Sequence, residues 1–246
     1  MFYEDDEFLE LESGILEQTS FKASSLTHSQ AARHLKEGFI RRHLMMQSSR
    51  IFMRENTQPS RTSPLSSYLS VELGVHVNAY YLNLCGALDN LAWLLTYELA
   101  LNPRISEEDR SRNYCNLFGE RFLNDLRTVK PSLTDTLQAE LEWNKDIRMF
   151  RDPAAHRIPL YAAPGVLNEA DIDEYRKIES MASKSEEERD GEARSSILQR
   201  ARELAKYYPV MMSSSSSELQ VHSIPDQIAK DHRTFLRVAE AVIKSL

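Results

Sequence analysis

The sequence lacks the motifs that carry several well-known kinds of enzyme chemistry. Its 246 residues contain only seven glycines and two cysteines. There is no GxxxxGKS/T or GxGxxG loop, no HExxH or CxxC motif, and no GxSxG nucleophile motif. Nucleotide hydrolysis through a P-loop, dinucleotide redox chemistry, zinc proteolysis and hydrolase-type serine chemistry therefore have no motif support.

The chain also lacks an excess of positive charge. Lys and Arg number 30 against 37 Asp and Glu, which gives a formal net charge of −7 and a pI near 5.6. Proteins that bind double-stranded nucleic acid usually carry a broad basic surface. A polyanionic partner would therefore need a local positive site on this protein.

Neither a secretory signal nor a membrane-spanning segment is predicted. The start, MFYEDDEFLELESG, is acidic and has no basic segment followed by an apolar run. The most apolar window, 79–101, contains Asp89 and Glu98, which are costly in hydrocarbon, so we expect a core helix there. Cys85 and Cys115 lack metal-ligand spacing, and we expect buried structural thiols in a reducing, cytoplasmic protein.

Helix is the element that the remaining pattern favours. Few glycines argue against a turn-rich β architecture, and apolar residues recur at helical spacing in long segments. We predict an all-α fold, an up-and-down bundle of four to five long helices. Its longest helices are expected at 28–56, at 67–101, after Pro131 and at 224–246.

The chain is interpreted as one domain with four parts. Residues 1–27 are an acidic N-terminal arm, either mobile or docked, and 28–157 supply the bundle helices. Residues 158–223 are an insertion, read as a charged, solvated helical hairpin followed by a small β-hairpin around its run of serines. Residues 224–246 form a C-terminal helix that completes the bundle.

Local signals set several boundaries within these parts. Ser106 and Ser132 are expected to cap helices, because each precedes a segment of helical character. The stretch 114–118 is ambiguous between strand and helix and is interpreted as a loop. Pro153 has no amide proton for the helix ladder, so we expect the helix after Pro131 to kink or end near Arg151.

That helix end carries the residues best suited to chemistry, in the stretch FRDPAAHRIPLY. Cleavage of an RNA phosphodiester without a metal needs a proton-transfer group and a cation that stabilises the phosphorane. His156 suits the first role and Arg151 the second, because a guanidinium can bind two phosphate oxygens at once. A turn that projects both to one side, with Asp152 orienting either, would meet the geometry.

The stretch resembles the signature of the HEPN superfamily of compact α-helical bundles: arginine, then usually Asn, Asp or His, three further residues, and histidine. The resemblance implies a metal-independent endoribonuclease with Arg151 as the phosphate-stabilising cation, His156 as the general acid/base and Asp152 as the polar partner. It implies a homodimer that brings two Arg-His pairs together, no cofactor, and a toxin–antitoxin or defence setting with RNA and an antitoxin or other protein as partners. Arg148 and Arg157 would add positive charge for substrate binding.

A noncatalytic alternative stays open, because HEPN domains include binding and scaffold modules. In that interpretation Arg151 and Asp152 form an intramolecular salt bridge and His156 caps a helix end. Other polar residues also have two interpretations. Asp89 and Asn90 either face the Arg-His site or form a satisfied core pair.

Two further groups are interpreted without a functional role. His76 is read as a core or rim histidine in preference to a ligand. The basic cluster 41–43, Arg-Arg-His, is read as a solvated helix face, with RNA contact as the alternative.

Overall fold

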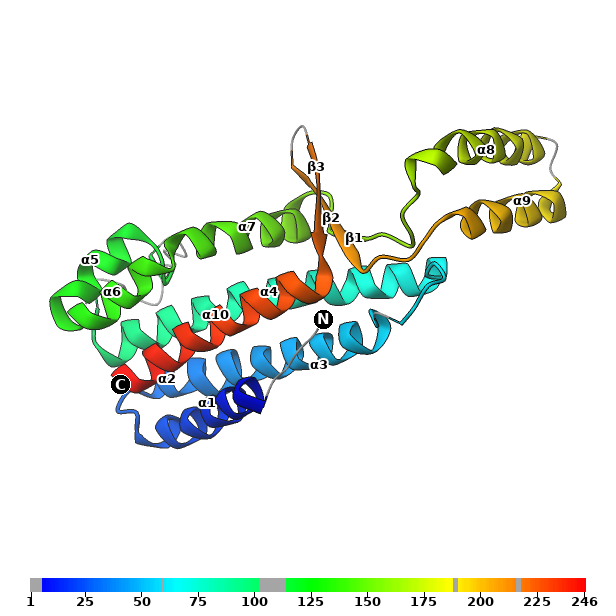
Figure 1. The fold of residues 1–246 in the computed structure, drawn as a ribbon. Coiled ribbons are helices and arrows are strands. Elements are labelled where there is room, and N and C mark those ends of the chain that lie inside the picture. The colour runs from blue at the N-terminus through cyan, green and yellow to red at the C-terminus, as the bar shows by residue number, and fades with distance from the viewer. Residues whose placement is uncertain (1–5, 59, 102–113, 188–189, 216–217) are drawn as a thin grey trace.

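The protein is a helical bundle with a small sheet and a projecting helical hairpin (Figure 1). A computed structural model describes residues 6–58, 60–101, 114–187, 190–215 and 218–246. Helix α4 (Ser67–Glu98) runs through the middle, with α3 (Arg41–Asn56), α7 (Leu141–His156) and α10 (Ile224–Ser245) along it. The predicted all-α bundle is confirmed.

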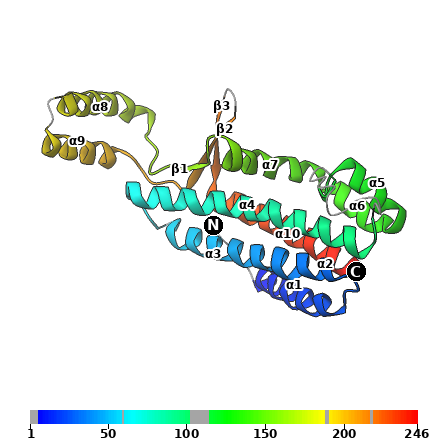
Figure 2. The same ribbon diagram turned by 180° about the vertical axis from the view of Figure 1, so that it is seen from behind.

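The N-terminal segment forms a docked helix. Helix α1 (Asp6–Ser25) packs against α10 and against the segment His34–Ile40, and both views of the ribbon show it beside the helical run that ends in α3 (Figure 2). Its buried side chains include Glu12, Ile15 and Thr19. Of the two expectations for the acidic arm, docking is therefore the one that the structure shows over the described part of this segment.

The predicted helix over 28–56 is one continuous helical run with an unusual middle. Helix α2 (Ser29–Arg33) leads into a π-helical segment, η1 (His34–Ile40), and this leads into α3. The wider π turn interrupts the regular spacing of side chains, and such segments are rare and frequently lie at functional sites. Periodicity alone had predicted the run but not its π-helical part.

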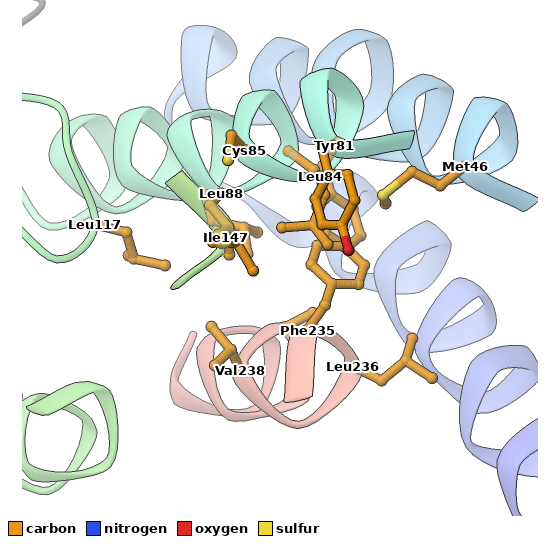
Figure 3. Close-up of a cluster of buried hydrophobic side chains, with 14 of the residues drawn as sticks. Met46, Tyr81, Leu84, Cys85, Leu88, Leu117, Ile147, Phe235, Leu236 and Val238 are labelled. Carbon is orange, nitrogen blue, oxygen red and sulfur yellow. The ribbon is translucent and has the colours of Figure 1, made fainter. Parts of the chain in front are cut away.

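Helix α4 is the core of the bundle. Ser66 caps its start by accepting a hydrogen bond from the Leu69 amide at 3.2 Å. Its side chains meet those of α7 and α10 in a continuous apolar cluster (Figure 3). The helix ends at Glu98, earlier than predicted, because Ala100 adopts a left-handed conformation, with φ of 49°, that closes the last turn.

The segment between α4 and α7 departs from the prediction in one respect. Helices α5 (Glu120–Val129) and α6 (Pro131–Ala139) precede α7, and a break at Glu140 separates α6 from α7. The single helix expected after Pro131 is therefore two, and Ser132 lies inside the first turn of α6 and makes no cap. The loop at 114–118 is confirmed, whereas the cap expected at Ser106 lies outside the described residues.

The insertion has the predicted make-up. Helices α8 (Ile172–Glu187) and α9 (Gly191–Leu204) form an antiparallel hairpin that projects from the bundle, after a short 3-10 turn, η2 (Glu169–Asp171). Strands β1 (Tyr161–Ala162), β2 (Val210–Ser215) and β3 (Glu218–Ser223) form an antiparallel sheet in that order. The tip of the helical hairpin includes residues outside the described part.

Among the described residues, no helix combines the length and the apolar character needed to cross a membrane.

Candidate active site

Helix α7 presents the Arg-His motif at its C-terminal half. Trp143, Ile147 and Phe150 form a buried stripe that packs this helix against the bundle core. Arg148 and Arg151 follow the edge of that stripe, one turn apart, and both are partly buried. The two arginines share an edge of the helix, as their spacing predicts.

A buried carboxylate fastens α7 to the bundle. Asp231 on α10 accepts hydrogen bonds from Trp143 Nε1 at 3.1 Å, from the Tyr81 hydroxyl at 2.9 Å and from Gln227 at 3.0 Å. Burial raises the pKa of Asp231, and the hydrogen bonds lower it. Three helices are thereby joined through one side chain, which fixes where α7 carries its arginines.

The expected helix end near Arg151 is wrong, because α7 continues through Pro153 to His156. Proline removes one helical hydrogen bond, and here that loss falls in the last turns of the helix. The Arg157 amide donates to the Pro153 carbonyl at 3.0 Å and completes the final turn. Arg151 and His156 are thus about 140° apart around the helix axis at 3.6 residues per turn. A single chain does not point both side chains to one side.

The side chains of the motif have different partners. Arg151 Nη1 lies 3.0 Å from Asp152 Oδ1, and the two side chains are 30% and 54% exposed. Arg148 Nη2 donates to Asn116 Oδ1 at 3.1 Å. His156 is exposed and makes no hydrogen bond or ion pair with any described residue. Hydrogen bonds or ion pairs therefore restrain the cationic side chains, Arg148 and Arg151, whereas the described residues do not restrain His156 in this way.

Asp89 on α4 is the acidic residue that faces these arginines. Burial raises the pKa of its carboxyl, while the positive charges of Arg148, Arg151 and Arg42 lower it. Burial is the largest of these effects. Of the two interpretations of Asp89, these charge effects favour the one in which it is directed toward the motif.

The cysteines offer no nucleophile. Cys85 and Cys115 are free and buried, as predicted. Burial raises the pKa of Cys85 to about 12 and that of Cys115 to about 11. Both thiols are therefore protonated at neutral pH, when only a thiolate would attack a substrate.

Asn90 and His76 have structural partners. Asn90 Oδ1 lies 3.1 Å from His34 Nδ1, so this amide pairs with η1 and not with the motif. His76 is half-buried and stacks on Phe52, with ring centroids 4.0 Å apart. The interpretation of His76 as a core or rim histidine is confirmed.

A buried polar network beneath α1 is the main feature that sequence reasoning missed. It consists of Glu12, His43, Arg50, Tyr80 and His232, and we call it the buried network. Glu12 Oε1 lies 2.7 Å from Arg50 Nη1 and 2.9 Å from His43 Nε2, and Arg50 Nη1 lies 2.7 Å from His232 Nε2. The Tyr80 hydroxyl lies 3.2 Å from His232 Nδ1. The reading of 41–43 as a solvated face is therefore wrong for His43, which is completely buried.

The sequence held a signal for this network. Phe39, His43, Met46, Arg50 and Met53 follow one another at spacings of three and four residues, and all five are buried. Two polar residues on an apolar stripe indicate buried partners, because an unpaired buried polar group is costly. Their carboxylate partner, in the N-terminal arm, could not be found from periodicity.

Three members of the buried network could in principle hold a metal ion. Ligand atoms of Glu12, His43 and His232 all lie within 4.8 Å of one another. Arg50 Nη1, however, lies 2.7 Å from both Glu12 Oε1 and His232 Nε2, where it already supplies a positive charge. Burial lowers the pKa of His232 to about 3, so its uncharged ring accepts from the guanidinium. The arrangement therefore serves as a structural ion network.

Comparisons of the chain with protein-family models, with curated proteins and with solved structures find no match. A functional proposal for this protein therefore rests on the chemistry of its own residues.

Proposed function

We propose that the protein is a metal-independent endoribonuclease of the HEPN type, acting as a toxin or defence effector. The observation that carries the proposal is the cationic edge of α7. Arg148 and Arg151 lie together beside Asp89, and an exposed histidine, His156, ends the same helix. The helix therefore carries the two kinds of group that metal-free phosphodiester cleavage needs.

In the proposed reaction His156 takes the proton from a ribose 2′-hydroxyl, and the 2′-oxygen attacks the adjacent phosphorus. The bond from phosphorus to the 5′-oxygen breaks, and His156, now protonated, acts as the general acid and returns its proton to that oxygen. The products are a 2′,3′-cyclic phosphate and a 5′-hydroxyl. Arg151 stabilises the charge on the phosphorane, Asp152 orients the guanidinium through their 3.0 Å contact, and Arg148 and Arg157 bind flanking phosphates.

The proposal requires a second copy of the chain. Because Arg151 and His156 point about 140° apart on one helix, a phosphate bound by Arg151 would meet the histidine of a partner. Asn78 on α4 donates from its Nδ2 to the Leu160 carbonyl at 2.8 Å and accepts at its Oδ1 from the Leu160 backbone amide at 3.0 Å. These two hydrogen bonds hold the segment after the motif against α4. Beside this contact α4 exposes an apolar strip that a second copy would cover. The strip consists of Tyr68, Val71, Val75 and Leu82.

The test is cleavage of end-labelled RNA by purified protein in excess chelator. We expect products with cyclic-phosphate ends from the wild type and at least a hundred-fold slower cleavage by Arg151→Ala and by His156→Ala. Lys145→Gln, an exposed change on the same helix, is the matched control and should cleave normally. Equal cleavage by wild type and Arg151→Ala would refute the assigned mechanism.

Dimerisation is tested by a separate experiment. Val75→Glu places a charge in the centre of the apolar strip. Because Val75 is 60% exposed, the fold should tolerate this change. We expect this variant to sediment as a monomer and to lose cleavage. Mixing Arg151→Ala with His156→Ala should restore part of the activity, because mixed dimers contain one intact composite site. Failure of complementation would argue against a shared site.

A noncatalytic interaction module is the second candidate function. The Arg151–Asp152 ion pair is what this alternative predicted, whereas the residue that caps the end of α7 is Arg157 and not His156. The charged α8–α9 hairpin, which projects from the bundle, would offer a docking surface (Figure 1). In this case wild-type protein cuts no RNA under any condition, and His156→Ala lowers only its thermal stability.

A further inference from the structure

A concave site lies where α4 packs against η1 and α3. A cavity of about 570 Å³, which we call the η1 cavity, opens between the π-helical segment, α3 and α4. Among the residues that line it are Arg33, His34, Arg41, Arg42, Asn83 and Asn90. Its volume falls within the range of sites for small organic ligands.

Two glycines give the η1 cavity its shape. A Cβ atom at Gly38 would lie 1.9 Å from Asn90 Oδ1, and one at Gly86 would lie 2.5 Å from the Arg42 Cζ. Either clash would displace a lining side chain. Glycine at both positions therefore lets the amide and the guanidinium lie against the backbone of the facing helix.

Hydrogen bonds hold the lining side chains in place before any ligand binds. Arg42 Nη1 donates to Asn83 Oδ1 at 3.2 Å. Asn90 donates to the Gly86 carbonyl at 2.6 Å, so its Oδ1 accepts from His34 Nδ1, 3.1 Å away. The His34 ring also stacks on Trp93, with centroids 5.5 Å apart. A site with prearranged donors loses less freedom on binding.

The charge of the η1 cavity favours an anion. Three arginines line it against one carboxylate, that of Glu37, which pairs with Arg33 at 3.4 Å. Arg41 is exposed and forms no ion pair with the described part of the chain. The local balance is thus positive on a protein whose formal net charge is −7. Arginine binds phosphate with two parallel donors, which a lysine cannot match.

We propose that the η1 cavity binds the phosphate of a nucleotide, either free or within an RNA strand. Arg41 and Arg42 hold the phosphate, and the amide and imidazole groups of Asn83, Asn90 and His34 contact the base or ribose. The cavity is too large for inorganic phosphate alone, and its amides match the donors and acceptors of a base. This inference stands apart from cleavage at α7 and does not depend on it.

The experiment measures binding by calorimetry to full-length protein at low and moderate salt. The probes are inorganic phosphate, AMP, ADP and a single-stranded RNA octamer with 2′-O-methyl groups, which cannot be cut through its 2′-hydroxyls. We expect Arg41→Gln to weaken nucleotide binding at least ten-fold. Arg42→Lys keeps the charge, loses the two-donor geometry and should also weaken binding. Lys36→Gln on η1 removes one exposed charge outside the cavity lining and is the matched control.

Each outcome decides one question. Binding of AMP or ADP that Arg41→Gln weakens supports a free nucleotide, whereas binding of the octamer alone supports RNA as the source. Inorganic phosphate bound as tightly as AMP would overturn the nucleotide assignment, and so would nucleotide binding that Arg41→Gln and Lys36→Gln affect equally. The absence of any binding by wild type refutes the proposal. Arg151→Ala should bind AMP and ADP normally, so loss of cleavage and loss of this site are distinguishable.

Discussion

Two groups of the same residue types, an arginine, a carboxylate and histidine, lie in opposite environments in this protein. In the buried network the Arg50 and Glu12 side chains are 4% and 5% exposed and lie 2.7 Å apart. On α7 the side chains of Arg151 and Asp152 are 30% and 54% exposed and lie 3.0 Å apart, with His156 in solvent. Side chains of the same types are therefore held in one arrangement in the buried network and are accessible to solvent on α7.

The difference shows that burial assigns these residues their roles. A charge taken out of water must be matched by partners, and it is then held in one arrangement. A pair at the surface is screened by water and contributes little to stability, which leaves it able to exchange partners. The buried network should therefore stabilise the fold, whereas the α7 group should affect activity with little effect on stability.

The largest effect is expected from Glu12→Gln, which breaks the buried side of this comparison. Removing the carboxylate breaks the buried ion pair between Glu12 and Arg50, and breaking such a pair costs about 3–5 kcal/mol. We expect that decrease in the free energy of unfolding, measured by urea denaturation. Glu17→Gln, an exposed change on the same helix, should alter it by less than about 0.5 kcal/mol. A loss below 1 kcal/mol for Glu12→Gln would contradict the assigned role.

Lowering the pH should also decrease the stability of the fold. The pKa of His232 is lowered from 6.5 to about 3 by burial, so between these values the unfolded chain binds a proton that the folded chain does not. Burial raises the pKa of Glu12, but the hydrogen bond to His43 and the positive charge of Arg50 help to lower it below its usual value. Stability is thus full above pH 6.5 and is lost as the pH falls.

One such proton gives a slope of up to about 1.4 kcal/mol per pH unit. The measurement is urea unfolding at pH 7, 6 and 5 for wild type and His232→Gln, and the difference between their slopes isolates the histidine. Parallel pH profiles for the two proteins would show that His232 titrates normally in the fold.

The sequence predicted the helices and the Arg-His motif better than it predicted the tertiary partners of individual residues. Helical periodicity in the chain located the bundle, and the proline-bounded motif pointed to Arg151 and His156. The end of α7 was predicted too early because of Pro153. A proline in the last turns removes only one hydrogen bond, which the end of a helix can lose. The role of His43 depends on Glu12, 31 residues away in sequence, and such pairing follows from tertiary packing that local periodicity does not encode.

The η1 cavity was equally beyond reach of the sequence. Gly38 and Gly86 lie within helical segments, where glycine weakens the helix and, as expected for Gly86, allows another helix to approach closely. Their importance lies in the facing side chains, Asn90 and Arg42. The basic cluster 41–43 was visible in the sequence, but its division into cavity-lining arginines and a buried histidine required the structure.

A smaller effect, with opposite sign, is expected at Asp89, a half-buried carboxylate on α4. Burial raises the pKa of Asp89, so its ionised form is disfavoured in the fold at neutral pH. The stability that this group contributes is lost as the pH rises through its folded pKa. Asp89→Asn should therefore stabilise the protein by about 1 kcal/mol or less at pH 7, measured by urea unfolding, and this gain should vanish at pH 4. Destabilisation at pH 7 would show that the arginines outweigh burial.

The smallest effect on stability is expected from Asp152→Asn, which tests the exposed side of the comparison. The Arg151–Asp152 pair is open to solvent, so the free energy of unfolding should change by less than about 0.5 kcal/mol. If Asp152 orients the guanidinium, cleavage should slow while RNA affinity stays near that of wild type, because Arg151 keeps its charge. A change in stability above 1 kcal/mol without a change in cleavage would instead make this pair a structural contact like the buried network, and would favour the noncatalytic module.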